Sequence, residues 1–320
     1  MPASHAVSKK PLLAAIEAGG TKYVCAVGYD PEQPLEEVRF PTRAPRETLA
    51  EAIDFFKTKA NEIGPIEALG IGTFGPAVID PSSPDYGSIL TTPKDGWEGF
   101  NVVSTIRSAL GYQLPIIFDT DVNAAVLSEA TFGAGVGRNH VAYITVGTGI
   151  GAAFIHDGKL LHGRLHPEVG HLLIPDFDTA IGKNTNTCRF HTSCFEGRAA
   201  GPAIEERWGA PGNLLPEDHQ AWDLQAEYLA AGCVTLTAVW SPDIIILGGG
   251  VIQKPGLIPK LRNEFKKQSG DYWPLPPLKE YLTIAQLDQE AGIIGSLMLA
   301  EKALQEAIGQ PHSQSHQVAS

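Results

Sequence analysis

The chain has 320 residues, of which 43% are hydrophobic and 19% charged, a composition typical of a globular protein rather than of a disordered or fibrous one. The formal net charge of −12 and the lack of a basic stripe argue against a nucleic-acid partner, because binding to phosphate backbones requires clustered lysine and arginine. No run reaches the about 18 apolar residues of a membrane span and no signal peptide opens the chain, so we expect a cytoplasmic protein with small-molecule ligands.

The first half of the chain alternates strands and helices. Apolar stretches predict strands over 12–19, 23–30 and 36–42, a helix over 45–64, and a buried strand over 66–75. Residues 76–100 form a proline-containing loop of a length that is often functional. A helix over 101–111 and an apolar strand over 115–118 lead into a further helix that begins near Asn123.

The second half follows the same plan. Strands are predicted over 140–147, 152–158, 243–250 and 282–287, and helices near 221–240, 257–268 and 291–307, with an irregular segment rich in cysteine and histidine before the first of these helices. The turn 147–149 takes the place that 19–21 has in the first half, which indicates two homologous lobes. The alternation predicts an α/β fold, and we expect the polar tail 310–320 to be disordered.

Four glycine-rich turns follow or interrupt apolar strands: "EAGGTK" at 17–22, "GTFGPA" at 72–77, "TVGTGIG" at 145–151 and "LGGGV" at 247–251. Glycine lets backbone N–H groups approach a phosphate, and Thr21 and Thr148 add hydroxyl donors. The turns match neither the Walker pattern nor the GxGxxG fingerprint, and tight hairpins use the same residues. Two similar turns in two similar halves nevertheless favour a nucleotide site.

Two aspartates, Asp119 and Asp121, lie where the strand 115–118 gives way to a helix. Asp119, Thr120 or Asp121 can cap that helix. A second carboxylate remains to accept a proton from a substrate hydroxyl as its oxygen attacks a phosphoryl group. Nearby, "WEGFN" brings Trp97 and Asn101 to the end of the long loop, where they form either an ordinary turn that caps the next helix or a wall over a polar ligand.

A candidate metal site begins in "HPEVGH", where Glu168 lies between His166 and His171 and its carboxylate can also hold sugar hydroxyls. Further on, a C-x2-H-x2-C cluster and one upstream histidine, His171 or His166, make a Cys2His2 set suited to tetrahedral zinc. Four protein ligands leave no open position, so the zinc would be structural, and a zinc-dependent hydrolase fails on ligand count. A reducing compartment disfavours the alternative of unliganded thiols or a disulfide between Cys188 and Cys194.

The motifs "EAGGTK", "GIGTFGPAVID", "TDVNAA", "TVGTGIGAA", "HPEVGH", "CRFHTSCFEG" and "LGGGV" together resemble, in order and spacing, those of the ROK family of sugar kinases and its bacterial fructokinase branch. The resemblance covers residues 12 to about 305. It implies a two-lobed, actin-like ATPase (ribonuclease H-like) fold with a ligand cleft between the lobes, and a homodimer. The lobes would be 10–122, with a C-terminal helix at about 294–309 packing back on it, and 123–293, with a zinc-binding segment at 166–197.

The resemblance also implies roles for individual residues. Asp121 matches the catalytic base, and the implied sugar-site residues are Thr120, Glu168, His171, Glu196, Gly75 and Trp97. The implied phosphate-binding residues are Gly19, Gly20, Thr21, Lys22, Gly147, Thr148 and Gly149, while Gly248, Gly249 and Gly250 would lie near the adenosine. The implied zinc ligands are His171, Cys188, His191 and Cys194. The implied cofactors are ATP, Mg²⁺ and a structural Zn²⁺.

Three departures from the common pattern of that family bear on the substrate. Glu17 stands where many members have aspartate, and His191 where other branches have cysteine, and both changes indicate the fructokinase branch. Thr120 replaces the common asparagine before the catalytic aspartate, which removes an amide and argues against glucose. The implied activity is ATP-dependent phosphorylation of D-fructose to fructose 6-phosphate. The alternatives are a glucokinase, mannokinase or N-acetylhexosamine kinase of the same family, and a non-catalytic sugar-binding regulatory protein.

Overall fold

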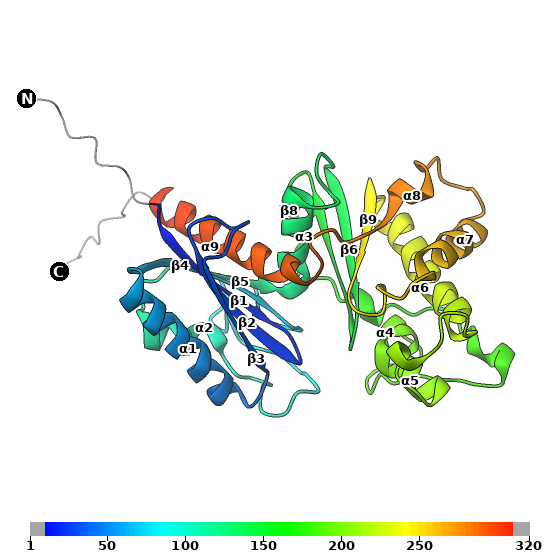
Figure 1. Cartoon of the computed structure of the whole chain (residues 1–320), viewed down its shortest axis with the longest axis horizontal. Coiled ribbons are helices and arrows are strands. Elements are labelled where there is room, and N and C mark those ends of the chain that lie inside the picture. The colour runs from blue at the N-terminus through cyan, green and yellow to red at the C-terminus, as the bar shows by residue number, and fades with distance from the viewer. Residues whose placement is uncertain (1–9, 310–320) are drawn as a thin grey trace, which may run out of the picture. The chain divides into compact units, whose positions relative to one another are not determined.

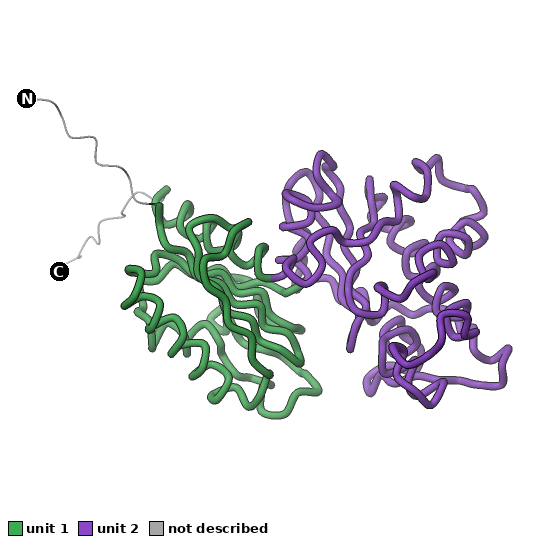
Figure 2. The backbone as a smooth tube through the Cα atoms, viewed as in Figure 1, with its two compact units in different colours: residues 1–121, 293–320 green, residues 122–292 purple. Residues whose placement is uncertain are grey.

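The computed structural model describes residues 10–309, which form two compact units, each built on a five-stranded sheet (Figure 1, Figure 2). One unit takes in the described residues up to Asp121 and those from Ile293 onwards, and the other spans Val122–Gly292. The chain therefore passes from one unit to the other twice. The tail 310–320, predicted to be disordered, lies outside the described residues.

The first unit contains β1 (Leu12–Ala18), β2 (Lys22–Gly28), β3 (Glu36–Pro41), α1 (Pro45–Glu62), β4 (Ile66–Thr73), α2 (Val102–Leu110), β5 (Ile116–Thr120) and most of α9 (Ala291–Gly309). Its strands lie in the order β3-β2-β1-β4-β5. The pairs β1–β2 and β2–β3 are antiparallel, whereas β1–β4 and β4–β5 are parallel. The predicted α/β class is confirmed, and each of these elements overlaps one predicted from the sequence.

Helices cover both faces of this sheet (Figure 1). Alternate residues of β1 point to opposite faces, so Ile16 packs in the cluster that includes α1 and α2, while Leu13 packs in the cluster that includes α9. Gly70 of β4 lets α9 approach closely, because a Cβ there would lie 1.8 Å from the carbonyl oxygen of Ser296. The result is a three-layer unit with its core on both sides of the sheet.

The second unit contains most of α3 (Asp121–Phe132), and β6 (His140–Val146), β7 (Ile150–His156), β8 (Lys159–Leu160), α4 (Phe195–Ala199), α5 (Gly201–Trp208), α6 (Ala221–Trp240), β9 (Ile244–Gly248), α7 (Leu257–Ser269), α8 (Leu278–Tyr281) and β10 (Leu282–Ile284). Short 3₁₀ turns lie at Val169–His171, Asp178–Ile181, Gly212–Leu214 and Asp288–Glu290. Its strand order, β10-β9-β6-β7-β8, repeats that of the first sheet when read from the other edge. The weak internal similarity of the sequence thus corresponds to one topology used twice.

This second sheet is also covered on both faces, with α3 on one side and α6 and α7 on the other (Figure 1). Tyr143 and Ile246 pack with α3, whereas Ile144 and Leu247 pack with α6 and α7. The short helices α4 and α5 lie in and just after the segment predicted to be irregular. Glycines and a proline at 197, 201 and 202 interrupt the helical pattern there, which explains why these helices were not predicted.

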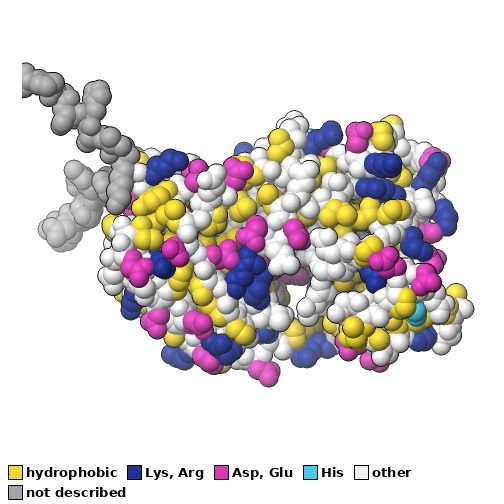
Figure 3. Space-filling model, viewed as in Figure 1, with side chains coloured by type: hydrophobic (Ala, Val, Ile, Leu, Met, Phe, Trp, Pro, Cys, Tyr) yellow, Lys and Arg dark blue, Asp and Glu magenta, His cyan; other side chains and the backbone are white. Residues whose placement is uncertain are grey.

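The face displayed in Figure 3 carries lysine and arginine side chains interspersed with aspartate and glutamate. No continuous basic stripe crosses that face. Within the described part of the chain, no helix has the length and apolar character needed to cross a membrane.

Candidate active site

Four side chains of the second unit form a cluster that could hold a metal ion. The ligand atoms of His171, Cys188, His191 and Cys194 all lie within 4.8 Å of one another. The Sγ atom of Cys188 is 3.5 Å from Nδ1 of His191 and 4.0 Å from Nδ1 of His171. The cysteines are free thiols, and the upstream histidine of the cluster is His171 rather than His166.

The donor set of this cluster fits zinc, which binds thiolate and neutral imidazole. Burial lowers the pKa of His171, which favours the neutral ring that binds metals. Burial also raises the pKa of the Cys194 thiol to about 11, and a bound cation would reverse that effect because a coordinating thiol is deprotonated. Four protein ligands would close the coordination sphere of such an ion, as is typical of structural zinc.

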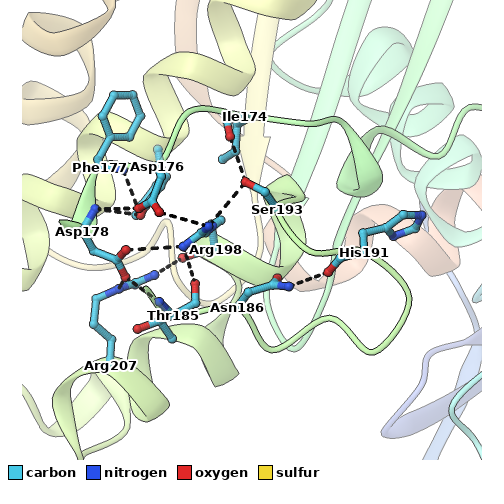
Figure 4. Close-up of polar contacts among 11 residues, drawn as sticks. Ile174, Asp176, Phe177, Asp178, Thr185, Asn186, His191, Ser193, Arg198 and Arg207 are labelled. Atoms are coloured by element: carbon cyan, nitrogen blue, oxygen red, sulfur yellow. Dashed lines mark hydrogen bonds and ion pairs between the residues drawn. The ribbon is translucent and has the colours of Figure 1, made fainter. Parts of the chain in front are cut away.

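A buried network of charges supports the segment that carries three of these candidate ligands (Figure 4). The guanidinium group of Arg198, on α4, donates to the carbonyl of Thr185 at 3.0 Å, to Asp176 at 3.3 Å and to Asp178 at 3.4 Å. It also donates to the hydroxyl of Ser193 at 3.4 Å. Arg198 therefore ties together both ends of the loop between His171 and α4.

Asp178 is the centre of that network, and its side chain has no exposed surface. It accepts hydrogen bonds from Nε of Arg207 at 2.7 Å and from the backbone N–H of Thr185 at 3.0 Å. Burial opposes ionisation of Asp178, but these hydrogen bonds outweigh it and hold its pKa well below the ordinary value. Arg207 also lies 5.1 Å from the ring centre of Tyr228, on α6, so the network fixes the loop to the core of the unit.

The glutamate of "HPEVGH" lies beside the other histidine of that motif. Nδ1 of His166 is 3.3 Å from Oε1 of Glu168, and the His166 side chain is only 3% exposed. Although 38% of the Glu168 side chain is exposed, burial of its carboxyl group and the nearby charge of Glu196 raise its pKa to about 7. The structure thus gives the two histidines different neighbours: His171 joins the cysteines, and His166 holds Glu168.

Glu196 lies at the start of α4, two residues after the candidate ligand Cys194. Its Oε2 atom accepts a 2.9 Å hydrogen bond from the backbone N–H of Ile150. Ile150 directly follows the 147–149 turn at the start of β7. The structure therefore places the predicted sugar-side glutamate against the predicted phosphate-binding turn of the same unit.

The glycine-rich turns of the two units have similar settings. Gly19 donates to the carbonyl of Lys22 in the β1–β2 hairpin, and Gly147 donates to the carbonyl of Gly149 in the β6–β7 hairpin, both at 2.9 Å. In the second unit, the backbone N–H of Val251 donates to the carbonyl of Val146 at 3.0 Å. The turn 248–250 therefore lies beside the turn 147–149, and the two can contact one ligand.

The aspartates at the end of β5 have distinct positions. Asp119 is the last but one residue of the strand, is 4% exposed, and its Oδ1 atom accepts a 2.8 Å hydrogen bond from the backbone N–H of Thr120. Thr120 ends the strand and is 2% exposed, and Asp121 begins α3 two residues earlier than predicted. Asp121 is thus a carboxylate at the carboxyl end of a parallel strand, where ligands of α/β sheets commonly bind.

Trp97 is buried in the first unit. It is 1% exposed, its Nε1 atom donates to the carbonyl of Arg43 at 2.9 Å, and its ring packs 5.3 Å from that of Phe74. A side chain so enclosed packs in the core of the first unit, and the wall over a polar ligand stays a prediction. The alternative of a turn that caps the next helix is confirmed for Asn101, which accepts a hydrogen bond from the backbone N–H of Ser104 at the start of α2. Gly75 lies just after β4, before a cis bond to Pro76.

The sequence reasoning missed the buried charge network. A sequence signal for a buried charge was present, because Arg198 interrupts the apolar and small residues that surround it in "CFEGRAAGPAI". Charged residues are almost never fully buried without a partner. Its partners Asp176 and Asp178 lie some twenty residues earlier, in a loop without periodicity, so the pairing could not be read from spacing.

Comparison with known proteins shows a family match over nearly the whole chain. Residues 13–303 match the model of the ROK family. The chain is 40% identical over 296 residues to a fructokinase of Pediococcus pentosaceus, covering 92% of this chain and 100% of that one. It is 38% identical to a fructokinase of Streptococcus mutans, covering 91% and 98%. Among solved structures, the ROK hexokinase of Thermus thermophilus matches with a TM-score of 0.72 and 27% identity, covering 92% and 99%.

Proposed function

The chain belongs to the ROK family, and we propose that it is a fructokinase, which transfers the terminal phosphoryl group of ATP to the 6-hydroxyl of D-fructose. The observation that carries this proposal is the similarity to two fructokinases at 38% and 40% identity over more than nine tenths of the chain. The fold supports it, because each unit has the actin-like topology of ATP-dependent sugar kinases, with a glycine turn between its first two strands.

In the proposed mechanism, Asp121 is the general base. Its carboxylate would accept the proton of the 6-hydroxyl as that oxygen attacks the terminal phosphorus of ATP. A carboxylate is suited to this role because both of its oxygens can accept a proton or a hydrogen bond. Mg²⁺, bound together with ATP, would supply positive charge that neutralises the phosphoryl groups.

We assign sugar binding to Glu168, His171, Glu196 and Thr120. Carboxylates can accept two hydrogen bonds in fixed directions, which suits neighbouring hydroxyls of a sugar. Glu168 and Glu196 are near enough for one to raise the pKa of the other, and His171 lies three residues from Glu168. Thr120 would present a hydroxyl where an asparagine would present an amide.

We assign the phosphates of ATP to the turns 19–22 and 147–149, and the adenosine to the turn 248–250. The contact of the turn 248–250 with the strand that leads into 147–149 supports this division, because adenosine and phosphates are parts of one ligand. Glycine at these positions leaves backbone N–H groups accessible to phosphate oxygens.

We propose that His171, Cys188, His191 and Cys194 hold one structural Zn²⁺. When bound, the ion would cross-link the loop to the 3₁₀ turn at Val169–His171 and so fix the position of Glu168. The four free cysteines suit a reducing compartment, and we propose a cytoplasmic enzyme that, like its family, forms a homodimer.

The identity of the product tests this function. Incubation with Mg²⁺, ATP and D-fructose, followed by ³¹P NMR of the sugar phosphate, should show fructose 6-phosphate formed in step with ADP. Phosphorylation at the 1-hydroxyl, or no sugar phosphate at all from zinc-replete protein, would contradict the proposal.

A further inference from the structure

The turn 147–149 is held at both ends by the helix pair α4–α5. The carboxylate of Glu196 on α4 accepts the 2.9 Å hydrogen bond from the backbone N–H of Ile150, at one end of the turn. The backbone N–H of Gly201, the first residue of α5, donates at 2.8 Å to the carbonyl of Gly147, at the other end. Both contacts come from one short stretch of chain.

The packing at this contact is close on both sides of the turn. A Cβ on Gly149 would lie 2.7 Å from Oε2 of Glu196, and a Cβ on Gly201 would lie 3.1 Å from the carbonyl oxygen of Gly147. On the other side, a Cβ on Gly170 would lie 2.0 Å from the carbonyl oxygen of Ile150. The approach at Gly170 meets backbone and therefore requires glycine, whereas Gly149 meets the end of the Glu196 side chain itself, so the turn and α4 are in close contact.

The position of α4 depends on the buried charge network, because the helix is too short to be stable by itself. α4 has only five residues, too few for a helix to be stable by itself. Arg198 on α4 donates to Asp176, Asp178 and the carbonyl of Thr185, and Arg207 on α5 donates to the carbonyl of Arg198 at 2.8 Å (Figure 4). These contacts hold α4 by groups that are not candidate metal ligands.

We propose that Glu196 is a positioning residue for the nucleotide: its carboxylate fixes the turn 147–149, and Arg198 fixes the helix that presents that carboxylate. The inference rests on the proposed function in one respect, the assignment of ATP phosphates to this turn. It gives Glu196 a role beyond contact with the sugar, and it gives the buried arginine a role in nucleotide affinity.

The test compares two substitutions of Glu196 in the full-length, zinc-replete protein without sugar. Hydrogen exchange of the Ile150 amide, followed by NMR, reports the contact, and calorimetry with Mg²⁺ and the ATP analogue AMP-PNP reports nucleotide affinity. Glu196→Ala should speed the exchange and weaken AMP-PNP by about one to two orders of magnitude, the scale of a lost hydrogen bond to a charged group. Glu196→Gln keeps an acceptor and should stay within about threefold of the wild type.

A matched control is Glu205→Ala, which removes a glutamate from the exposed side of α5 and should change neither measurement. Wild-type exchange and wild-type AMP-PNP affinity in Glu196→Ala would overturn the proposal. If the wild-type protein binds no AMP-PNP, the nucleotide role of the turn fails together with the proposed function. The exchange of Ile150 would then still show whether Glu196 holds the turn.

The role of the network is tested with Arg198→Met, measured in the same way and with zinc content as a third reading. We expect faster exchange of Ile150 and weaker AMP-PNP binding at unchanged zinc content. An Arg198→Met protein with wild-type AMP-PNP affinity would overturn the role of Arg198. Should that variant fail to fold, the Glu196 series still decides the proposal, because Glu196 is partly exposed and is not part of the buried network.

Discussion

Asp178 and Arg207 form a buried ion pair in which Oδ2 of the aspartate accepts a 2.7 Å hydrogen bond from Nε of the arginine, with neither side chain more than 1% exposed. Arg198 is the second cation of the same network, and Asp176 its second acid, so the charges balance. Such an arrangement is a strong constraint on conformation, because loss of one member leaves the others buried without compensation.

Asp178→Asn should therefore destabilise the second unit by about 3–5 kcal/mol, since it removes the acid that both arginines share. Denaturant unfolding followed by circular dichroism would measure the loss. The matched control is Asp223→Asn, which breaks an exposed ion pair with Lys260 and should change stability little. Equal effects of the two substitutions would show that the buried network does not stabilise the fold.

The same pair predicts a pH dependence. The pKa of Asp178 is lowered in the folded protein, so its contribution to stability is fully present above the ordinary aspartate pKa of about 3.9 and is lost as the pH falls through the lower, folded-state value. The difference in unfolding free energy between wild type and Asp178→Asn should be constant from about pH 5 to 8 and shrink in stronger acid. A difference that grows on acidification would contradict this sign.

Two histidine substitutions identify which of His166 and His171 binds the metal. His171→Ala should lose most of the bound zinc, while His166→Ala should keep it, because of these two histidines His171 is the one that lies with the cysteines. Zinc measured by plasma mass spectrometry on protein purified without added metal gives the answer. Retention of full zinc by His171→Ala would mean that the ligand set is wrong.

Removal of zinc should affect the two substrates unequally. The ion would fix the turn that carries Glu168, whereas α4 is held by the arginine network without it. Chelated protein should therefore bind fructose more weakly while its affinity for AMP-PNP stays close to that of the zinc-replete protein. Calorimetry with each ligand measures both, and a chelated protein with full sugar affinity would show that the metal does not organise the sugar site.

Asp121→Asn should abolish turnover with little effect on binding. Loss of a general base lowers kcat by about 10²–10⁴-fold, and the isosteric amide preserves the packing at the start of α3. Asp54→Asn, on the exposed side of α1, is the matched control. Wild-type rates in Asp121→Asn would rule out its role as the base.

Thr120→Asn tests the sugar preference. Introducing an amide beside Asp121 should raise kcat/KM for glucose relative to fructose by about tenfold, the scale of one or two hydrogen bonds that differ between the aldose and the ketose. The control Thr131→Asn lies on the exposed surface at the end of α3. An unchanged ratio in Thr120→Asn would mean that this position does not select the sugar.

The sequence predicts the strands and long helices of both units well, for a local reason. Alternation in "LLAAIEA" places Leu13 and Ile16 on opposite faces of one sheet, and the glycines at 19 and 147 mark the hairpins. These signals need only neighbouring residues. The similar glycine turns in the two halves predicted that both units share one sheet topology, because such turns are also a local signal.

The sequence is less informative about contacts and burial that depend on residues far apart in the chain. His166 and His171 flank the same glutamate, so spacing alone left the upstream ligand open, and only the fold separates their neighbours. The buried setting of Trp97 depends on Phe74 and on a carbonyl 54 residues away. The contact between Glu196 and Ile150 joins residues 46 apart, across a loop without periodicity.

ADP release measured with Mg²⁺ and ATP across a panel of hexoses tests the central claim most directly. The panel should include fructose, glucose, mannose and N-acetylglucosamine, and a reaction without sugar. The proposed function predicts rapid ADP release with fructose, a lower kcat/KM with every other sugar, and almost none without sugar. ADP release that does not depend on any sugar, or none from zinc-replete protein, would contradict it.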